Sequence, residues 1–170
     1  TALQNTLSIE DYSSSDFIKS SNNLLIKKDL KIENKNIVFE KNYWKISASH
    51  NGYFKKFKLD HHREIEFYPE QFKFIGHDKI VRKDPDKQIK FDIRFHLHPD
   101  SKVMKTQNNK FILIQLEDEG WQFCCDNYDI NIDNGLYFGN KNSYKENQNI
   151  FISGMNNEKE QIIKWEINKI

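Results

Sequence analysis

The stretch Ile89-Lys90-Phe91-Asp92-Ile93-Arg94-Phe95-His96-Leu97-His98-Pro99 decides the fold class, because apolar and polar residues alternate along it. Successive side chains of a β-strand point to opposite faces, so the apolar residues around Phe95 would face a core. Arg94, His96 and His98 would share the opposite face. Two imidazoles beside a guanidinium call for an anion, a metal or ordered water, which makes this strand the first candidate for function. A polar, solvated sheet face is the equally weighted alternative.

The same period-two pattern covers most of the chain and predicts strands throughout. They lie at residues 7–9, 24–26, 31–33, 37–39, 43–47, 63–68, 71–75, 89–95, 110–116, 121–124, 128–132, 149–153 and 162–167. Turns are predicted between them at residues 51–52, 108–109, 119–120, 134–135 and 154–157, and exposed loops at 13–16 and 20–23. About a dozen strands without a linker predict one all-β domain over residues 1–170, an antiparallel β-sandwich.

The core of this sandwich should form from the apolar phase of the strands. The side chains that we expect to be mostly buried are Trp44, Phe91, Ile93, Phe95, Leu97, Ile112, Ile114, Trp121, Phe123 and Trp165. Tryptophan in an alternating strand is more often part of a core than a platform for sugars.

Composition and charge exclude several classes of function. The net charge is +1, from 26 basic and 25 acidic residues, which argues against nucleic acid or a membrane surface as partner. Cys124 and Cys125 are adjacent and form neither a disulfide framework nor a metal motif. No apolar run is long enough to span a membrane. The chain starts at Thr1 with a strand-like segment, so we expect it to be a piece of a longer protein.

A second group of candidates lies upstream of the histidine strand. His50 precedes a predicted Asn51-Gly52 turn, with Tyr53 directly after it, and both could contact sugars or transfer protons. An ordinary hairpin end is the somewhat more probable alternative from composition alone. Arg63 begins a strand after two histidines, where a basic patch would suit an acidic polymer and a solvated, lysine-protected edge explains it as well.

Several segments, taken in order, resemble a known family. They are Asn5–Asp11, Ser47–Tyr53, His62-Arg63, Arg94–Pro99, Gly120–Phe123, Ile152–Gly154 and Trp165. Together they span nearly the whole chain and look like the C-terminal domain of heparinase II/III-like proteins. The segments Ser49–Tyr53 and Arg94–Pro99 are the most specific parts of this resemblance.

The resemblance implies a polysaccharide lyase that acts on uronic-acid-containing chains, in a bacterial periplasm or cytoplasm. In such proteins an N-terminal helical toroid precedes the β-sandwich, and the substrate cleft lies between them. A base removes the C5 proton of the uronate, an acid protonates the leaving glycosidic oxygen, and an unsaturated sugar remains. The tyrosine acid comes from the toroid, so no catalytic residue is assigned to this chain.

The resemblance also implies a zinc ion, held by two histidines and a carboxylate, and a histidine immediately before the Asn-Thr pair. Gln4 occupies that position here, which weakens both expectations. His50 remains the best candidate ligand, and Asp11 and Asp16 are possible carboxylates.

Three hypotheses about function follow, and the ordered resemblance argues against the third, an unrelated β-sandwich adhesin or carrier. In the first, the domain is part of a lyase, and it contacts an acidic polysaccharide through His50, Tyr53, Arg63, Arg94, His96 and His98. In the second, it is a non-catalytic module that binds glycan or supports the helical domain. The isolated chain is predicted to be inactive in either case, because it lacks the toroid and has Gln4 in place of a histidine.

Overall fold

The computed structural model of the chain is an all-β protein, as the alternation predicts. It describes residues 5–15, 17–20, 23–26, 30–140 and 143–170. The strands are β1 (Leu7–Ile9), β2 (Phe17–Ser20), β3 (Asn23–Ile26), β4 (Ile32–Glu40), β5 (Tyr43–His50), β6 (Leu59–Tyr68), β7 (Lys73–Arg82), β8 (Ile89–His96), β9 (Lys102–Lys105), β10 (Phe111–Gln115), β11 (Gly120–Cys125), β12 (Ile130–Asn140), β13 (Ser143–Asn156) and β14 (Glu160–Lys169). The helices described are one turn each, α1 (Phe54–Phe57) and the 3-10 helix η1 (Pro69–Gln71), and none could cross a membrane.

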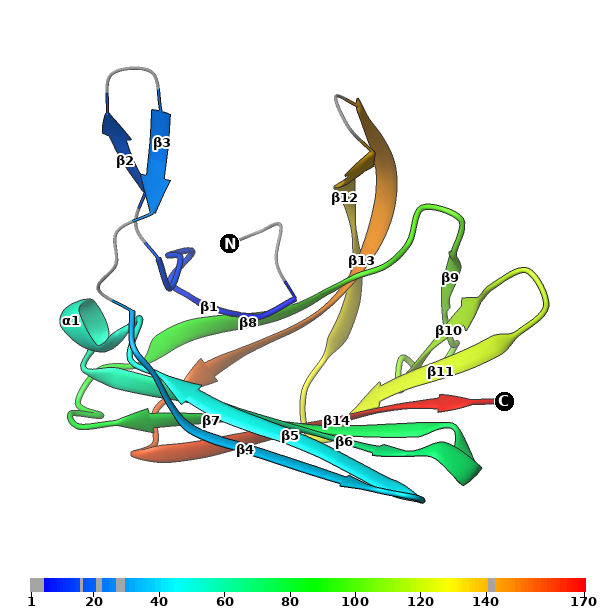
Figure 1. The fold of residues 1–170 in the computed structure, drawn as a ribbon, viewed down its shortest axis with the longest axis horizontal. Helices are drawn as coiled ribbons and strands as arrows, with labels where there is room; N and C mark the ends of the chain where they lie inside the picture. The colour runs from blue at the N-terminus through cyan, green and yellow to red at the C-terminus, as the bar shows by residue number, and fades with distance from the viewer. Residues whose placement is uncertain (1–4, 16, 21–22, 27–29, 141–142) are drawn as a thin grey trace.

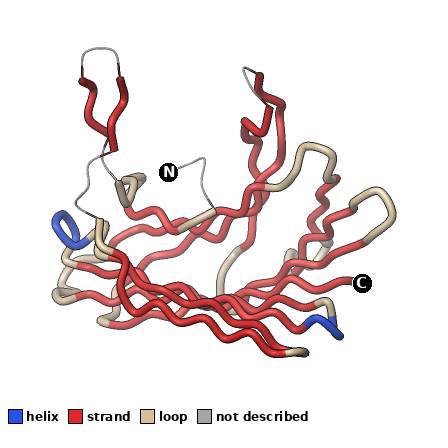
Figure 2. The backbone as a smooth tube through the Cα atoms, viewed as in Figure 1, coloured by secondary structure: helices blue, strands red, loops and turns tan. Residues whose placement is uncertain are grey.

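Two antiparallel sheets of unequal size form the sandwich (Figures 1 and 2). The larger sheet has eight strands in the order β4-β5-β6-β7-β14-β11-β10-β9, and the smaller has four in the order β1-β8-β13-β12. Strands β2 and β3 form a separate hairpin. This hairpin and the far end of the β12–β13 hairpin project on the side of the molecule where β1 and β8 lie (Figure 1).

The core lies between the two sheets and confirms most of the predicted buried residues. Phe95 of β8 packs its ring 4.9 Å from that of Phe123 on β11 and 4.8 Å from that of Trp165 on β14. Of the ten residues expected in the core, seven are buried: Phe91, Ile93, Phe95, Ile112, Ile114, Phe123 and Trp165. Leu97 and Trp121 are partly buried against this core.

The expectation that Trp44 is buried is wrong, since 40% of the residue is exposed. Trp44 faces the same side of the larger sheet as the core residue Phe123, through a continuous cross-strand register. The four-stranded sheet is too small to cover the whole inner face of the eight-stranded one. The part of that face near the edge strand β4 is therefore exposed to solvent. There Trp44 stacks on Phe39, which is 75% exposed, with ring centroids 5.0 Å apart.

Some turn predictions are also wrong. Gly135 and Gly154, predicted in turns, lie inside the long strands β12 and β13, where they pair with Asn147 and Phe91 respectively. Strand β7 begins at Lys73 rather than at Gln71, because η1 and the left-handed residue Phe72 make the turn before it. Of the predicted loops, Ser20 and Asn23 belong to β2 and β3, and Asp16 lies outside the described residues.

Candidate functional site

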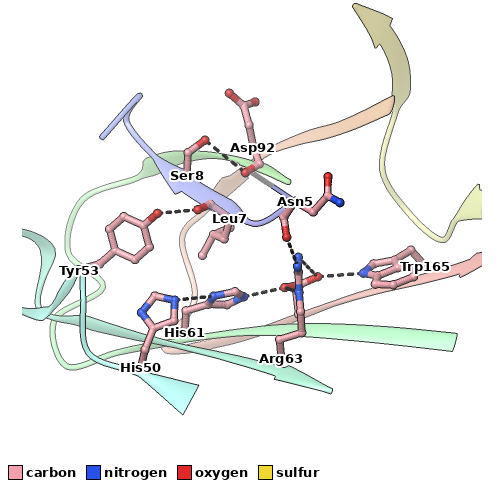
Figure 3. A network of polar contacts seen from close by, with 10 residues as sticks. Asn5, Leu7, Ser8, His50, Tyr53, His61, Arg63, Asp92 and Trp165 are labelled. Atoms are coloured by element: carbon pink, nitrogen blue, oxygen red, sulfur yellow. Dashed lines mark hydrogen bonds and ion pairs between the residues drawn. The ribbon is translucent and has the colours of Figure 1, made fainter. Parts of the chain in front are cut away.

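A carboxylate, Asp78 of β7, is fully buried between the sheets and collects hydrogen bonds from three side chains. Arg63 of β6 approaches it with two nitrogens, Nε at 2.8 Å from Oδ1 and Nη2 at 3.0 Å from Oδ2. The indole Nε1 of Trp165 donates to Oδ2 at 2.8 Å, and His61 Nε2 lies 2.6 Å from Oδ1. Asp78 is therefore the centre of a polar network inside an apolar core. Figure 3 shows His61, Arg63 and Trp165 of this network pointing toward one another.

The network continues from His61 to His50 and ends at a backbone amide. Gly52 N–H donates to His50 Nδ1 at 3.2 Å, so this nitrogen accepts and the ring hydrogen of His50 sits on Nε2. His50 Nε2 then donates to His61 Nδ1, 3.1 Å away, and His61 Nε2–H donates to Asp78. The hydrogen bonds of the two imidazoles thus run in one direction, from Gly52 toward the carboxylate.

Burial and charge set the protonation of this network. Burial alone would raise the pKa of Asp78, but the Arg63 guanidinium and the hydrogen bond from His61 outweigh it and hold that pKa well below its ordinary value. Burial, together with the basic neighbours His61 and Arg63, lowers the pKa of His50 to about 4. Near neutral pH the network therefore holds an ionised Asp78 and a neutral His50.

Asn5 connects this network to the smaller sheet. Arg63 Nη1 donates to the backbone oxygen of Asn5 at 2.5 Å, and the Asn5 side chain accepts from the backbone N–H of His96 at 2.5 Å. The segment that enters β1 is thereby held by β6 of the larger sheet and by the end of β8. The predicted site residues Arg63 and His96 are brought near each other through Asn5.

A pocket of about 380 Å³ lies beside Asn5, between the end of β8 and the part of the β12–β13 hairpin that extends beyond it. It is lined by Asn5, His96, Leu97, His98, Leu136, Tyr137, Phe138, Gly139 and Asn147. Asn147 is buried, and its Oδ1 has no hydrogen-bond partner among the described residues. His98 is exposed and lies edge-on to Tyr137, with ring centroids 5.2 Å apart. The pocket thus offers an amide and two imidazoles to a polar ligand.

Arg94 lies on the same outward face of β8 as His96, two residues further from the pocket. Its Nη1 is 3.5 Å from Asp92 Oδ2 and 3.4 Å from Ser8 Oγ. Asp92 is buried, and the Ser153 hydroxyl also donates to its carboxylate. Arg94 thus pairs with a buried carboxylate two residues away on its own strand.

Tyr53 belongs to the core rather than to a loop tip. The residue is 1% exposed, and its hydroxyl donates to the backbone oxygen of Leu7 at 2.5 Å (Figure 3). Burial raises the pKa of this phenol. In this structure Tyr53 fixes strand β1, and its side chain is out of reach of solvent.

The predicted residues therefore fall into two groups. His50 and Arg63 meet around Asp78 between the sheets, whereas Arg94, His96 and His98 lie on or just beyond the outward face of β8, and Asn5 joins the groups. Neither His61 nor Asp78 is among the site residues predicted from the sequence, where His61 is only one of the available imidazoles for a metal. A signal existed for Asp78, because a carboxylate on the apolar phase of an alternating strand needs buried partners.

The zinc ion implied by the resemblance does not fit the residues around His50 as the structure describes them. Both ring nitrogens of His50 are hydrogen-bonded, to Gly52 and to His61. Within the described ranges, the three-ligand group that could hold a metal does not include His50 or Asp11. Gln4 and Asp16 lie outside the described residues.

The fold and the network define a class: an antiparallel β-sandwich domain with a buried Asp-His-Arg centre and a polar pocket at the end of one sheet. The family described as heparinase II/III-like, C-terminal, matches residues 1–166. The chain therefore belongs to this family.

Solved structures of low sequence identity share the fold. A heparan sulfate lyase HepC mutant from Pedobacter heparinus has a TM-score of 0.74 and 14% identity, over 99% of this chain and 24% of that one. A heparinase III structure has a TM-score of 0.66 and 14% identity, over 98% of this chain and 23% of that one. The chain thus spans about a quarter of these relatives. No curated protein matches the sequence.

Proposed function

We propose that this domain forms one wall of the substrate cleft of a lyase that cleaves uronic-acid-containing polysaccharide by β-elimination. A helical toroid, N-terminal to the domain in the same protein, supplies the opposite wall and the acid. The observation that carries the proposal is the pocket at the end of β8, where His96, His98 and Asn147 surround the anchored Asn5. Membership of the heparinase II/III-like C-terminal family supports it.

Each group has a role in this proposal. His96 and His98 present imidazoles to a uronate, and Asn147 offers an amide oxygen that lacks a partner among the described residues. Arg94 can exchange its contact with Asp92 for a uronate carboxylate, which a guanidinium binds with two parallel hydrogen bonds. Arg63 and Tyr53 hold Asn5 and Leu7 in place through hydrogen bonds. His50 supports them indirectly, through His61 and the Asp78 to which Arg63 is bound.

The proposal is tested by turnover of uronate polymers, followed by absorbance of the unsaturated product. The full-length protein should form product, and the 170-residue chain alone should not. In the full-length protein, Arg94→Lys should raise KM more than it lowers kcat, because a point charge replaces a bidentate contact. Product formation by the isolated chain above a heat-killed control would show that the toroid is not needed.

A non-catalytic glycan-binding or structural module is the second candidate, and Gln4 favours it. Glutamine cannot serve as a base, whereas the family resemblance implies a histidine there. Binding of uronate oligosaccharides by the full-length protein without turnover would support this candidate. Activity gained by Gln4→His would show that one position separates the two functions.

A further inference from the structure

A cluster of three potential metal ligands lies on the outer face of the larger sheet, away from the Asp78 network. Glu64, Glu66 and His77 each bring one ligand atom to within 4.8 Å of the others. Glu64 of β6 lies directly opposite His77 of β7, and Glu66 follows two residues later on the same face. The rigid cross-strand register therefore holds all three side chains together.

His77 makes no hydrogen bond or ion pair with any described residue, although two carboxylates are nearby. Its Nδ1 is buried and has no partner within the described ranges. A buried polar nitrogen without a partner costs free energy, and a ligand bound to the ring would remove that cost.

Each carboxylate is oriented by one neighbour and keeps its other oxygen available. Lys45 Nζ lies 2.6 Å from Glu64 Oε2, and the Tyr68 hydroxyl donates to Glu66 Oε2 at 2.5 Å. Neither Oε1 is hydrogen-bonded to another residue in the part of the chain that the structure describes. The Lys45 ammonium already provides one positive charge to a group that carries two negative ones.

A pocket of about 380 Å³ adjoins the cluster and gives solvent access to it. Glu64 and His77 line this pocket, together with His62 and Lys79. Lys164 lies opposite His77 on the other side, but its ammonium pairs with Glu166 at 2.9 Å. Water could therefore complete a coordination sphere built on the three side chains.

We propose that Glu64, Glu66 and His77 bind a divalent transition-metal cation. Two carboxylate oxygens and one imidazole nitrogen suit zinc or manganese, and the imidazole selects against calcium and magnesium. Zinc binds such N/O sites more tightly than manganese, so it is the probe of choice. This site is separate from the β8 pocket and does not depend on the proposed lyase function.

The test is calorimetric titration of the 170-residue chain with Zn²⁺, with circular dichroism to check the fold of each variant. We expect saturable binding of one ion, weakened at least about tenfold by His77→Gln and by Glu66→Gln. Lys45→Gln should tighten binding, because it removes the cation that competes for Glu64. His98→Gln is the matched control, an exposed histidine beside Asp100 at 3.4 Å, and should leave the affinity unchanged.

Two results would overturn the proposal. One is the absence of saturable Zn²⁺ binding by the folded chain. The other is binding that His77→Gln leaves intact; if His50→Gln then abolishes it, the ion belongs to the buried histidine pair instead.

Discussion

Trp165 and Asp78 are 87 residues apart in sequence, yet the indole of one donates a 2.8 Å hydrogen bond to the buried carboxylate of the other. Their strands, β14 and β7, are neighbours in the larger sheet, and Trp165 lies directly opposite Gly76. A Cβ atom on Gly76 would come within 2.0 Å of the indole ring. The missing side chain at position 76 therefore provides the space in which the indole reaches Asp78.

Gly76→Ala should displace the Trp165 indole and break its bond to Asp78. We expect a loss of about 1–3 kcal/mol in the free energy of unfolding, typical of overpacking in a core. Urea denaturation followed by tryptophan fluorescence measures it. Gly120→Ala is a milder control, since the nearest atom to its added Cβ is 3.1 Å away on Ile170. Equal stability of Gly76→Ala and the parent chain would contradict the packing described here.

Asp78→Asn should destabilise the domain strongly, because Arg63 and His61 would lose their buried anionic partner. Removing one member of a buried charge pair costs about 3–5 kcal/mol. The matched control is Asp100→Asn, whose exposed carboxylate lies beside His98, and it should change stability by less than about 0.5 kcal/mol. Similar losses in the two variants would argue against a central role for Asp78.

The stability of the domain should decrease with acidity in a window set by His50. In the folded state its pKa is lowered to about 4, and the ordinary value is 6.5. Between these values the unfolded chain binds a proton that the folded chain does not, so the contribution of His50 is complete above pH 6.5 and is lost as the pH falls to about 4. The loss amounts to about 3 kcal/mol at most.

Denaturant titrations at several pH values measure this dependence. His50→Gln should flatten the slope between pH 4 and 6.5. His62, whose pKa is lowered by burial and by Lys79, would account for a residual slope. An unaltered slope in His50→Gln would assign the dependence to other groups.

Phe95→Ala should cost about 3–5 kcal/mol in the free energy of unfolding, the usual price of a large cavity in a core. Phe95 is 8% exposed and contacts both Phe123 and Trp165. Phe39→Ala removes the same side chain near the edge strand β4, where the smaller sheet does not cover the larger one, and should cost less than about 1 kcal/mol. Comparable losses would mean that this edge is as well covered in solution as the core.

Periodicity was sufficient to predict the fold class and most of the core, because burial and strand geometry act on the same alternation. It failed at Trp44 because the two sheets differ in size, so part of the larger sheet is left uncovered. The alternating sequence of β5 is the same for a covered and an uncovered strand, so it could not predict this exposure. It also failed at Gly135, where a turn-forming pair continues a long strand opposite Asn147.

The site was harder to predict than the fold. Arg63 pairs directly with Asp78 across the β6–β7 hairpin, and this register depends on the turn at Pro69–Phe72. The predicted strand 71–75 overlaps that turn, so the register could not be derived from the sequence. The link between Arg63 and Asn5 joins residues 58 positions apart in sequence. Contacts of that range follow from how the sheets pack, which local patterns do not encode.

The unequal sheets have a practical consequence for handling this domain. Strand β4 is at the edge of the larger sheet, and Ile37 and Phe39 on it and Ile46 on β5 are each more than half exposed. Such an edge invites strand-to-strand association between molecules. The solubility of concentrated preparations of the domain should therefore decrease in salts such as sulfate, which strengthen apolar contacts. Ile37→Lys or Phe39→Lys should restore it.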